Sequence, residues 1–202
     1  MMNLLSVRAV RAFALAAVTA GLAGCASPPT NIEFAEMTFR HLPQIQLLAN
    51  DLTVESRMLS PGAGQNVAHQ FPTPPETALR NWARDRLVAR GAGTSGATAT
   101  FTIIRAEATS QPLKTDTGFT GLFKQELGNR YDARVEATLT IRDRNGRNGN
   151  VEARAQHSAT VREDSTLVER RKVMYEITEK LMAEFNAEME RNIRSYLRDF
   201  VQ

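Results

Sequence analysis

The stretch RYDARVEATLTI, residues 130–141, alternates without exception between two kinds of side chain. The apolar or small members are Tyr131, Ala133, Val135, Ala137, Leu139 and Ile141. The charged or hydroxylated members are Arg130, Asp132, Arg134, Glu136, Thr138 and Thr140. Because successive side chains of a β-strand point to opposite faces of its sheet, this pattern predicts a strand with one buried face and one face in water.

A partner for this strand is expected just beyond it. Residues 143–150, DRNGRNGN, hold two Asn-Gly pairs, which suit the positive φ angles of hairpin turns. The apolar period of two then resumes at Val151, Ala153, Ala155, Ala159 and Val161. The two runs together predict an antiparallel hairpin with one buried face.

A first helix is expected upstream of the hairpin. Thr73 and Glu76 have the spacing of a capping box, Pro74 suits the first helical position, and Gly91 suits a helix stop. One apolar stripe is formed by Leu79, Trp82, Ala83 and Leu87. Arginines occupy its other faces, where they either meet lipid phosphates or lie in water: Arg80, Arg84, Arg86 and Arg90.

A second, longer helix is expected from a capping box at Thr166 and Glu169 to about Arg198. Its apolar residues recur at every fourth position, at Val173, Ile177, Leu181, Phe185, Met189, Ile193 and Leu197. Four residues turn a helix by about 400°, so this stripe drifts by about 40° per step. We therefore expect the helix to curve, to break near Asn186, or to leave the sheet in its C-terminal part.

Further strands are predicted at residues 45–54 and 99–103, where apolar residues also alternate. The element order is then β-α-β-β-β-α. It predicts an α+β fold, a two-layer sandwich of an about four-stranded, mostly antiparallel sheet and two helices. Residues 44–202 are expected to form this single domain, and the first β-α-β is compatible with a right-handed crossover.

The N-terminus carries a different signal. Arg8 and Arg11 precede a short apolar run, and small residues then lead to LAGCAS, residues 22–27, which holds the only cysteine. A basic start, an apolar core too short to span a bilayer and a small-residue cleavage site are typical of a secretory signal peptide. We expect residues 1–24 to be this signal and residues 25–43 to be a lipidated tether. The alternative, that Cys25 is a buried thiol in an N-terminal helix, is not favoured.

Leu-Ala-Gly-Cys resembles the bacterial lipobox, in which the cysteine is acylated and becomes the new N-terminus. The resemblance implies that Cys25 carries acyl chains such as palmitate. In lipoproteins of this kind an aspartate after the cysteine marks retention in the inner membrane. Here that residue is Ala26, so the resemblance implies the periplasmic face of the outer membrane.

Few residues suggest catalysis, and no cofactor or metal site is expected. With Cys25 as the anchor no cysteine is left for a site, and the three histidines, His41, His69 and His157, form no helical zinc pair. His157 would share a face with Ala155, where it is either a structural group or a general base beside an acid. Loss of the signal lowers the formal net charge from +3 to +1, which does not favour nucleic acid.

A contact surface for a partner or a membrane is predicted outside the strands. GFTGLF, residues 118–123, places three large apolar residues in a glycine-flanked segment, and the drifting helix stripe leaves others that the sheet cannot easily cover. The predicted contact residues are Phe119, Leu122, Phe123, Ile193 and Leu197. The alternative is that the segment folds into the edge of the core.

The lipobox, PPETALRNWARDRL (74–87), GLFKQELGNRYDARVEATL (121–139) and the closing helix resemble small Gram-negative envelope lipoproteins. In outline the chain is similar to the lipopolysaccharide-assembly lipoprotein and to auxiliary lipoproteins of lipid-transporting ABC systems. The resemblance implies a non-enzymatic binding or accessory module in envelope assembly or lipid transport. Two alternatives stay open, a periplasmic hydrolase using His157 and a structural envelope tether.

Overall fold

The computed structural model describes residues 33–58, 65–91, 96–113 and 127–202. The chain divides into two compact units, Met1–Glu33 and Phe34–Gln202. The second unit holds the helices and strands described below. It begins before residue 44, where the sequence analysis placed the start of the domain.

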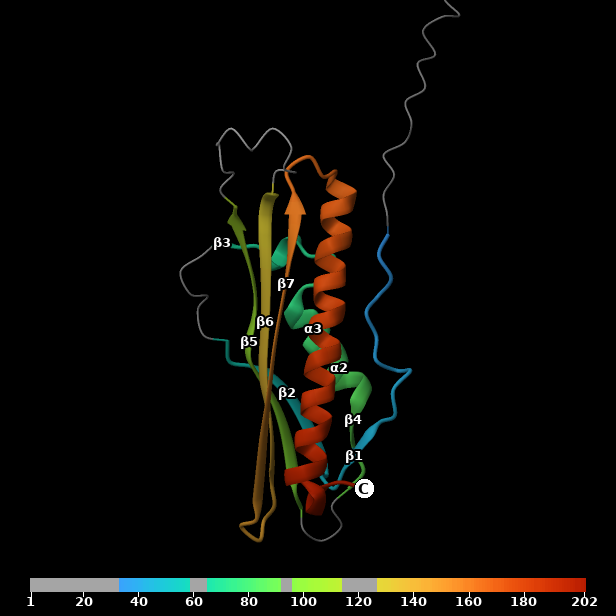
Figure 1. The fold of residues 1–202 in the computed structure, drawn as a ribbon. Helices are drawn as coiled ribbons and strands as arrows, with labels where there is room; N and C mark the ends of the chain where they lie inside the picture. The colour runs from blue at the N-terminus through green and yellow to red at the C-terminus, as the bar shows by residue number, and fades with distance from the viewer. Residues whose placement is uncertain (1–32, 59–64, 92–95, 114–126) are drawn as a thin grey trace, which may run out of the picture. The chain divides into compact units, whose positions relative to one another are not determined.

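One layer of this unit is a five-stranded sheet (Figure 1). Its strands lie in the order β2 (Asp51–Ser56), β5 (Thr98–Pro112), β6 (Leu127–Arg142) and β7 (Asn148–Arg162), and β3 (Gln65–Asn66) also pairs with β5. β5, β6 and β7 are antiparallel, whereas β2 is parallel to β5. The predicted hairpin is therefore confirmed, and so is the α+β fold with its β-α-β-β-β-α order.

The turn of the β6–β7 hairpin uses only one of the two Asn-Gly pairs. Gly146 has a φ of +83°, and the Asp143 carboxylate accepts a hydrogen bond from the Asn145 N–H at 2.9 Å. Gly149 lies inside β7, without a positive φ. A Cβ atom at Gly149 would overlap the side chain of Leu197, so this glycine leaves room for the residues that follow α3 and does not serve the turn.

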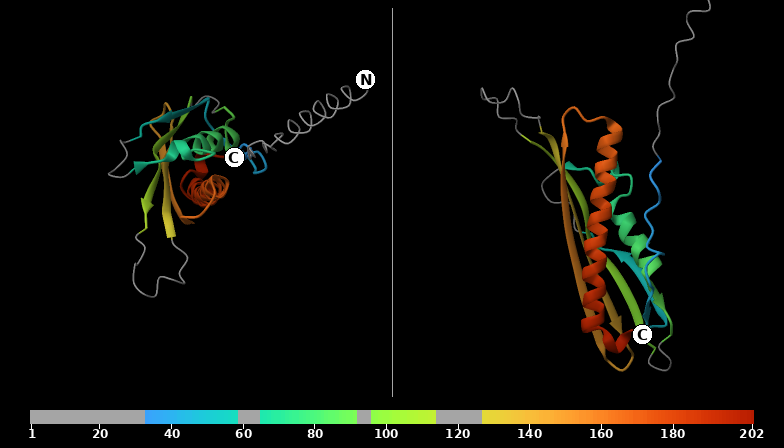
Figure 2. Two further views of the ribbon diagram at one scale, coloured as in Figure 1. Left: turned by 90° about the horizontal axis from the view of Figure 1, so that it is seen from above. Right: turned by 45° about the vertical axis from the view of Figure 1, so that its right-hand side comes forward.

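The second layer consists of α2 (Pro75–Arg86) and α3 (Leu167–Tyr196), which cover one face of the sheet (Figure 2). Trp82 of α2, Phe185 of α3 and Phe101 of β5 are fully buried and meet between the layers. The Trp82 ring centroid lies 5.5 Å from that of Phe101 and 5.2 Å from that of Phe185. This aromatic cluster is the centre of the core.

α3 begins as predicted and runs without a break. The Thr166 hydroxyl accepts from the Glu169 N–H at 3.2 Å, and the Glu169 carboxylate accepts from the Thr166 N–H at 2.7 Å. The predicted break near Asn186 is wrong, because its side-chain oxygen accepts a hydrogen bond from Trp82 Nε1 at 2.9 Å inside the continuous helix. The stripe stays buried as far as Leu197. A twisted sheet can follow a stripe that winds around its helix.

α2 begins one residue later than predicted, and its capping box does not form. The Glu76 carboxylate accepts from Arg80 at 2.7 Å, one turn further along the helix. Thr73 contributes its carbonyl, which accepts a hydrogen bond from the Thr178 hydroxyl of α3 at 3.1 Å. The residues that looked like a cap therefore serve a helix–helix contact and a surface ion pair.

α2 ends at Arg86 and does not continue to Gly91, because the chain becomes β4 (Leu87–Ala89). β4 pairs in parallel with β1 (Ile45–Leu47) in a separate two-stranded sheet. The segment 45–54, predicted as one strand, is thus divided between β1 and β2, which belong to different sheets.

The C-terminal residues explain this division. Val201 forms a bridge with Leu47, and the Gln202 N–H donates to a β1 carbonyl at 3.0 Å. The Leu48 N–H donates to the Phe200 carbonyl at 2.8 Å. These contacts pair β1 with the C-terminal residues, and the chain bends at Leu48 and Asn50 before it joins β5 as β2.

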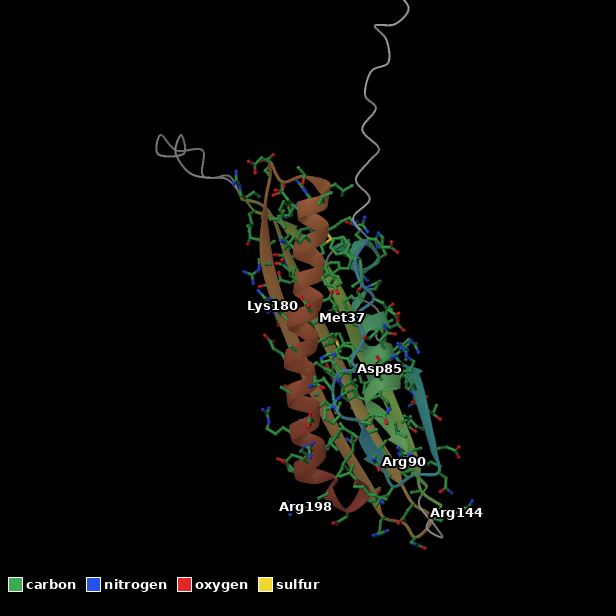
Figure 3. The ribbon with its side chains drawn as sticks, turned by 90° about the vertical axis from the view of Figure 1, so that its right-hand side faces the viewer. Met37, Asp85, Arg90, Arg144, Lys180 and Arg198 are labelled. Atoms are coloured by element: carbon green, nitrogen blue, oxygen red, sulfur yellow. The ribbon has the colours of Figure 1, made fainter. Side chains whose placement is uncertain are left out.

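Residues 34–44 run along the helices, with a turn at residues 40–42, and are called the strap here (Figure 3). Met37 and Phe39 are buried in the core. The Met37 carbonyl accepts from the Asn81 side chain at 3.0 Å, and the Phe39 N–H donates to the Asp85 carboxylate at 2.9 Å. The strap is therefore part of the domain, although the sequence analysis placed it in the tether.

Arg86 joins the strap to both helices. Its guanidinium is fully buried and donates to the Pro43 carbonyl and to the Glu190 carboxylate of α3, at 2.6 Å for the latter. Glu190 also binds Arg194 at 2.7 Å. Arg86 thus neither meets lipid nor lies in water, the two roles that the sequence analysis left open for the arginines of this helix.

Asp85 makes the strap sensitive to acid. Burial raises the pKa of its carboxyl, but the hydrogen bond from Phe39 and the contact with Arg84 outweigh burial, so the pKa lies below its ordinary value of 3.8. A depressed carboxyl pKa stabilises the fold above the unfolded value, and this contribution is lost as the pH falls through the folded value.

Asp85→Asn is expected to cost about 1–3 kcal/mol of unfolding free energy at pH 7 and less at pH 3, which lies below the ordinary carboxyl pKa. Urea denaturation of both proteins at the two pH values measures this difference. Asp51→Asn, on an exposed carboxylate, is the matched control and should change stability by less than about 0.5 kcal/mol at either pH. An Asp85→Asn cost that stays the same at pH 3 would contradict the assigned role of the charge.

Candidate functional site

The helices leave one face of the sheet uncovered, and this outer face is the candidate site (Figure 2). Its residues on β6 are the polar set that the alternation predicted. β5 adds Thr98, Thr100, Thr102, Arg105 and Glu107, and β7 adds Asn150, Glu152, Arg154 and Gln156. The outer face is therefore hydroxyl-rich toward the β6–β7 turn and charged toward the other end of the strands.

Side chains directly opposite each other on neighbouring strands interact across the sheet. In one row Glu136 lies between Arg105 and Arg154, and in the next row Arg134 is opposite Glu107. Charges of opposite sign thus alternate both along and across the strands, which gives this part of the outer face a fixed polar pattern.

One hollow on this face, called the charged hollow here, has a volume of about 720 Å³ and is lined by Arg105, Arg134, Glu136, Arg154 and Gln156, among others. The Glu136 carboxylate lies 3.5 Å from the Arg154 guanidinium and 3.9 Å from that of Arg105. Arg134 is exposed and makes no ion pair with any residue that the structure describes. The charged hollow therefore presents one guanidinium that is free to bind a ligand.

A β-bulge between Ile103 and Arg105 places Arg105 in this hollow. Before the bulge odd-numbered residues such as Phe101 point inward, whereas after it even-numbered residues such as Ala106 are buried. A bulge adds a residue to one strand and re-aims the side chains beyond it. The alternation predicted a strand only as far as residue 103, so Arg105 was missed; the reversal of the alternation after Ile104 was the available signal.

A second, smaller hollow has a volume of about 310 Å³ and is lined by hydroxyls and a few charges. Its lining comprises Thr53, Glu55, Arg57, Thr98, Thr100, Thr102, Thr140 and Arg142. The Thr102 hydroxyl donates to Glu55 at 3.0 Å, and the Thr140 hydroxyl donates to Asn150 at 2.7 Å. Each threonine hydroxyl can both donate and accept, so this hollow suits a polar, hydrogen-bonding surface.

The chemistry of the two hollows is that of recognition. Guanidinium groups bind carboxylates and phosphates with two parallel hydrogen bonds, and amides and hydroxyls fix the orientation of such a group. Both hollows are lined mainly by polar groups. The outer face thus fits a polar partner rather than an acyl chain.

His157 does not belong to either hollow. It lies half-buried between β7 and α3, on the face that the alternation predicted, with its Nδ1 atom 3.5 Å from a Glu184 carboxylate oxygen. A general base must reach the proton of a bound substrate. This position instead gives His157 a contact between the two layers.

Two of the predicted contact residues are wrong. Ile193 and Leu197 are fully buried, because α3 continues along β7 and its stripe remains covered to its end. The exposed large apolar side chains of α3 are Leu167 and Tyr196, at its two ends. Cys25, Phe119, Leu122 and Phe123 lie outside the described residues, so for them the prediction stands as it was made.

Two properties of the described ranges bear on the site. In residues 33–58, 65–91, 96–113 and 127–202, no group of three or more His, Cys, Asp or Glu side chains is arranged to hold a metal ion. Within those same ranges, neither helix is long and apolar enough to cross a membrane.

Comparison with known proteins adds no family: no protein-family model and no curated protein matches this chain.

Proposed function

We propose that the protein is a lipoprotein anchored through Cys25 to the periplasmic face of the outer membrane. In this proposal it is a non-catalytic binding or accessory module in envelope assembly or lipid transport. The N-terminal motif LAGC and the following Ala26 support the anchor and its address. The observation that carries the binding role is the uncovered sheet face with its two polar hollows.

The position of the polar residues favours binding over catalysis. The charged hollow offers Arg134 beside an amide, Gln156, whereas His157 points to the opposite face of the same strand. A hydrolase would need its base within hydrogen-bond reach of a bound substrate. We therefore assign the outer face to a partner with carboxylates, phosphates or amides on its surface, an envelope protein or a lipid headgroup.

The apolar residues of GFTGLF provide a second predicted contact. β5 ends at Pro112 and β6 begins at Leu127, so the segment between them starts and ends at the end of the sheet where α3 begins. Phe119, Leu122 and Phe123 remain predicted contact residues for a partner or the membrane.

Co-purification from detergent extracts tests the binding role. The lipidated wild-type chain is expected to retain a partner or a bound lipid, and Arg134→Glu should reduce its recovery at least tenfold, which is about 1.4 kcal/mol. Reversing one charge at a polar interface costs at least this much when the partner is anionic there. Recovery is measured by quantitative mass spectrometry of the eluate.

Arg191→Glu is the matched control, because Arg191 is an exposed arginine on the helix side of the domain. It should leave recovery unchanged. If no stable partner or lipid is recovered with the wild-type chain, the binding role fails. If Arg134→Glu retains the partner as well as Arg191→Glu does, the outer face is not the binding surface.

A further inference from the structure

The strap has a fixed direction along α3. At its start, Phe34 stacks on Tyr175 at 5.3 Å between ring centroids, with the Arg171 guanidinium 5.3 Å from the Phe34 centroid. At its end, Pro43 binds Arg86, which in turn binds Glu190. The strap therefore enters the domain near the N-terminal end of α3 and runs toward its C-terminal end.

The length of chain before the strap limits where the anchor can lie. Cys25 precedes Phe34 by nine residues. Nine residues span at most about 32 Å when fully extended. The distance along α3 from Arg171 to Tyr196 is about 38 Å at 1.5 Å per residue. If the far end of α3 stood on the membrane, Phe34 would lie about 38 Å from the bilayer. The nine residues that join Phe34 to an acylated Cys25 are too short to bridge that distance.

The near end of α3 offers a suitable contact. Leu167, the first residue of the helix, is 73% exposed, and it lies on the same helical stripe as Arg171 and Tyr175. Lys172 is also exposed in this part of the helix, with its Nζ atom 3.9 Å from a Glu176 carboxylate oxygen. A large apolar side chain with cationic neighbours fits the boundary between acyl chains and phosphate headgroups.

The other charges at this end are largely engaged. Arg162 pairs with Asp164, and Arg170 donates to the Glu163 carbonyl at 2.7 Å. Glu169 is held in the capping box of α3. Acids and bases are both present, so the contact does not depend on a strongly anionic membrane.

We infer that the domain stands on the lipid bilayer with the end at which α3 begins, that Leu167 lies at the lipid surface, and that the end with the β6–β7 turn and Arg198 points away from it (Figure 3). This inference rests on the proposed lipid anchor. It adds the orientation of the domain and a membrane-contact surface of its own.

Leu167 and Tyr196 form a matched pair for the test, since they are 73% and 75% exposed at opposite ends of the same helix. Cys25 is the only cysteine and is blocked when acylated, so Leu167→Cys and Tyr196→Cys each add a single free thiol. Each lipidated variant is labelled with a bimane probe and reconstituted into phosphatidylethanolamine–phosphatidylglycerol vesicles. Some vesicles carry brominated acyl chains, which quench probes at the membrane surface.

The probe at position 167 is expected to be quenched at least threefold more than the probe at position 196. Lys172→Cys and Arg198→Cys form a second pair that avoids loss of the leucine itself. Flotation of the labelled protein with the vesicles reports the anchor separately. Floating protein with equal quenching at both ends, or with more at position 196, overturns the orientation and leaves the anchor standing. Protein that does not float overturns the anchor and the orientation with it.

Discussion

Trp82→Ala is expected to lower the free energy of unfolding by about 3–5 kcal/mol, the usual cost of truncating a fully buried aromatic residue. Trp82 packs against Phe101 and Phe185 between the two layers, so the change leaves a cavity that neither layer can close alone. It also removes the hydrogen bond that Trp82 Nε1 donates to the Asn186 side chain of α3. Both losses act in the same direction.

Urea denaturation followed by circular dichroism measures this effect; because Trp82 is the only tryptophan, its fluorescence disappears in the variant. Tyr196→Ala removes an aromatic side chain that is 75% exposed and should change stability by no more than about 0.5 kcal/mol. A loss of less than about 1 kcal/mol for Trp82→Ala would show that the core is not centred on this aromatic cluster.

Cys25→Ser is expected to move the protein from the membrane fraction to the soluble fraction. Each buried methylene contributes about 0.8 kcal/mol to membrane binding, and several acyl chains together hold a protein stably. A serine hydroxyl does not replace the acylated sulfur. Mass spectrometry of the wild-type protein should find lipid on a chain that begins at Cys25.

Ser27→Ala, two residues beyond the cysteine, is the matched control and should remain in the membrane fraction. The fractions are compared by immunoblot after a high-salt wash, which removes proteins held by charge alone. A Cys25→Ser protein that still sediments with washed membranes would place the anchor elsewhere in the chain.

The strands could be predicted where apolar and polar residues alternate along the sequence, because this alternation indicates which side chains are buried. Along β6 each side chain either enters the core or faces water, so the alternation from Arg130 to Ile141 carried the information on its own. The capping box of Thr166 and Glu169 was equally local. The capping box predicted for α2 does not form because the helix begins one residue later, with Pro74 as its N-cap, and Glu76 pairs with Arg80 instead.

The strap and the charged hollow depend on such distant partners. The contact between Phe39 and Asp85 joins residues 46 positions apart, and without it residues 34–43 look like a polar tether. Arg105 reaches the outer face only because a bulge shifts the register of β5 against β6. The burial of Leu197 depends on Gly149, which was predicted to serve a turn.

The strap also has a mechanical consequence. A force applied through the chain that precedes Phe34 would act along the strap, while the hydrogen bonds of Met37, Phe39 and Pro43 to α2 lie across it. When a force acts along the strap, these hydrogen bonds share it and break together. A force that pulled one end of the strap away from α2 would break them one at a time. Rupture would therefore also break the hydrogen bond that the buried guanidinium of Arg86 donates to Pro43. With the proposed lipid anchor at Cys25, this arrangement would resist tension transmitted from the membrane.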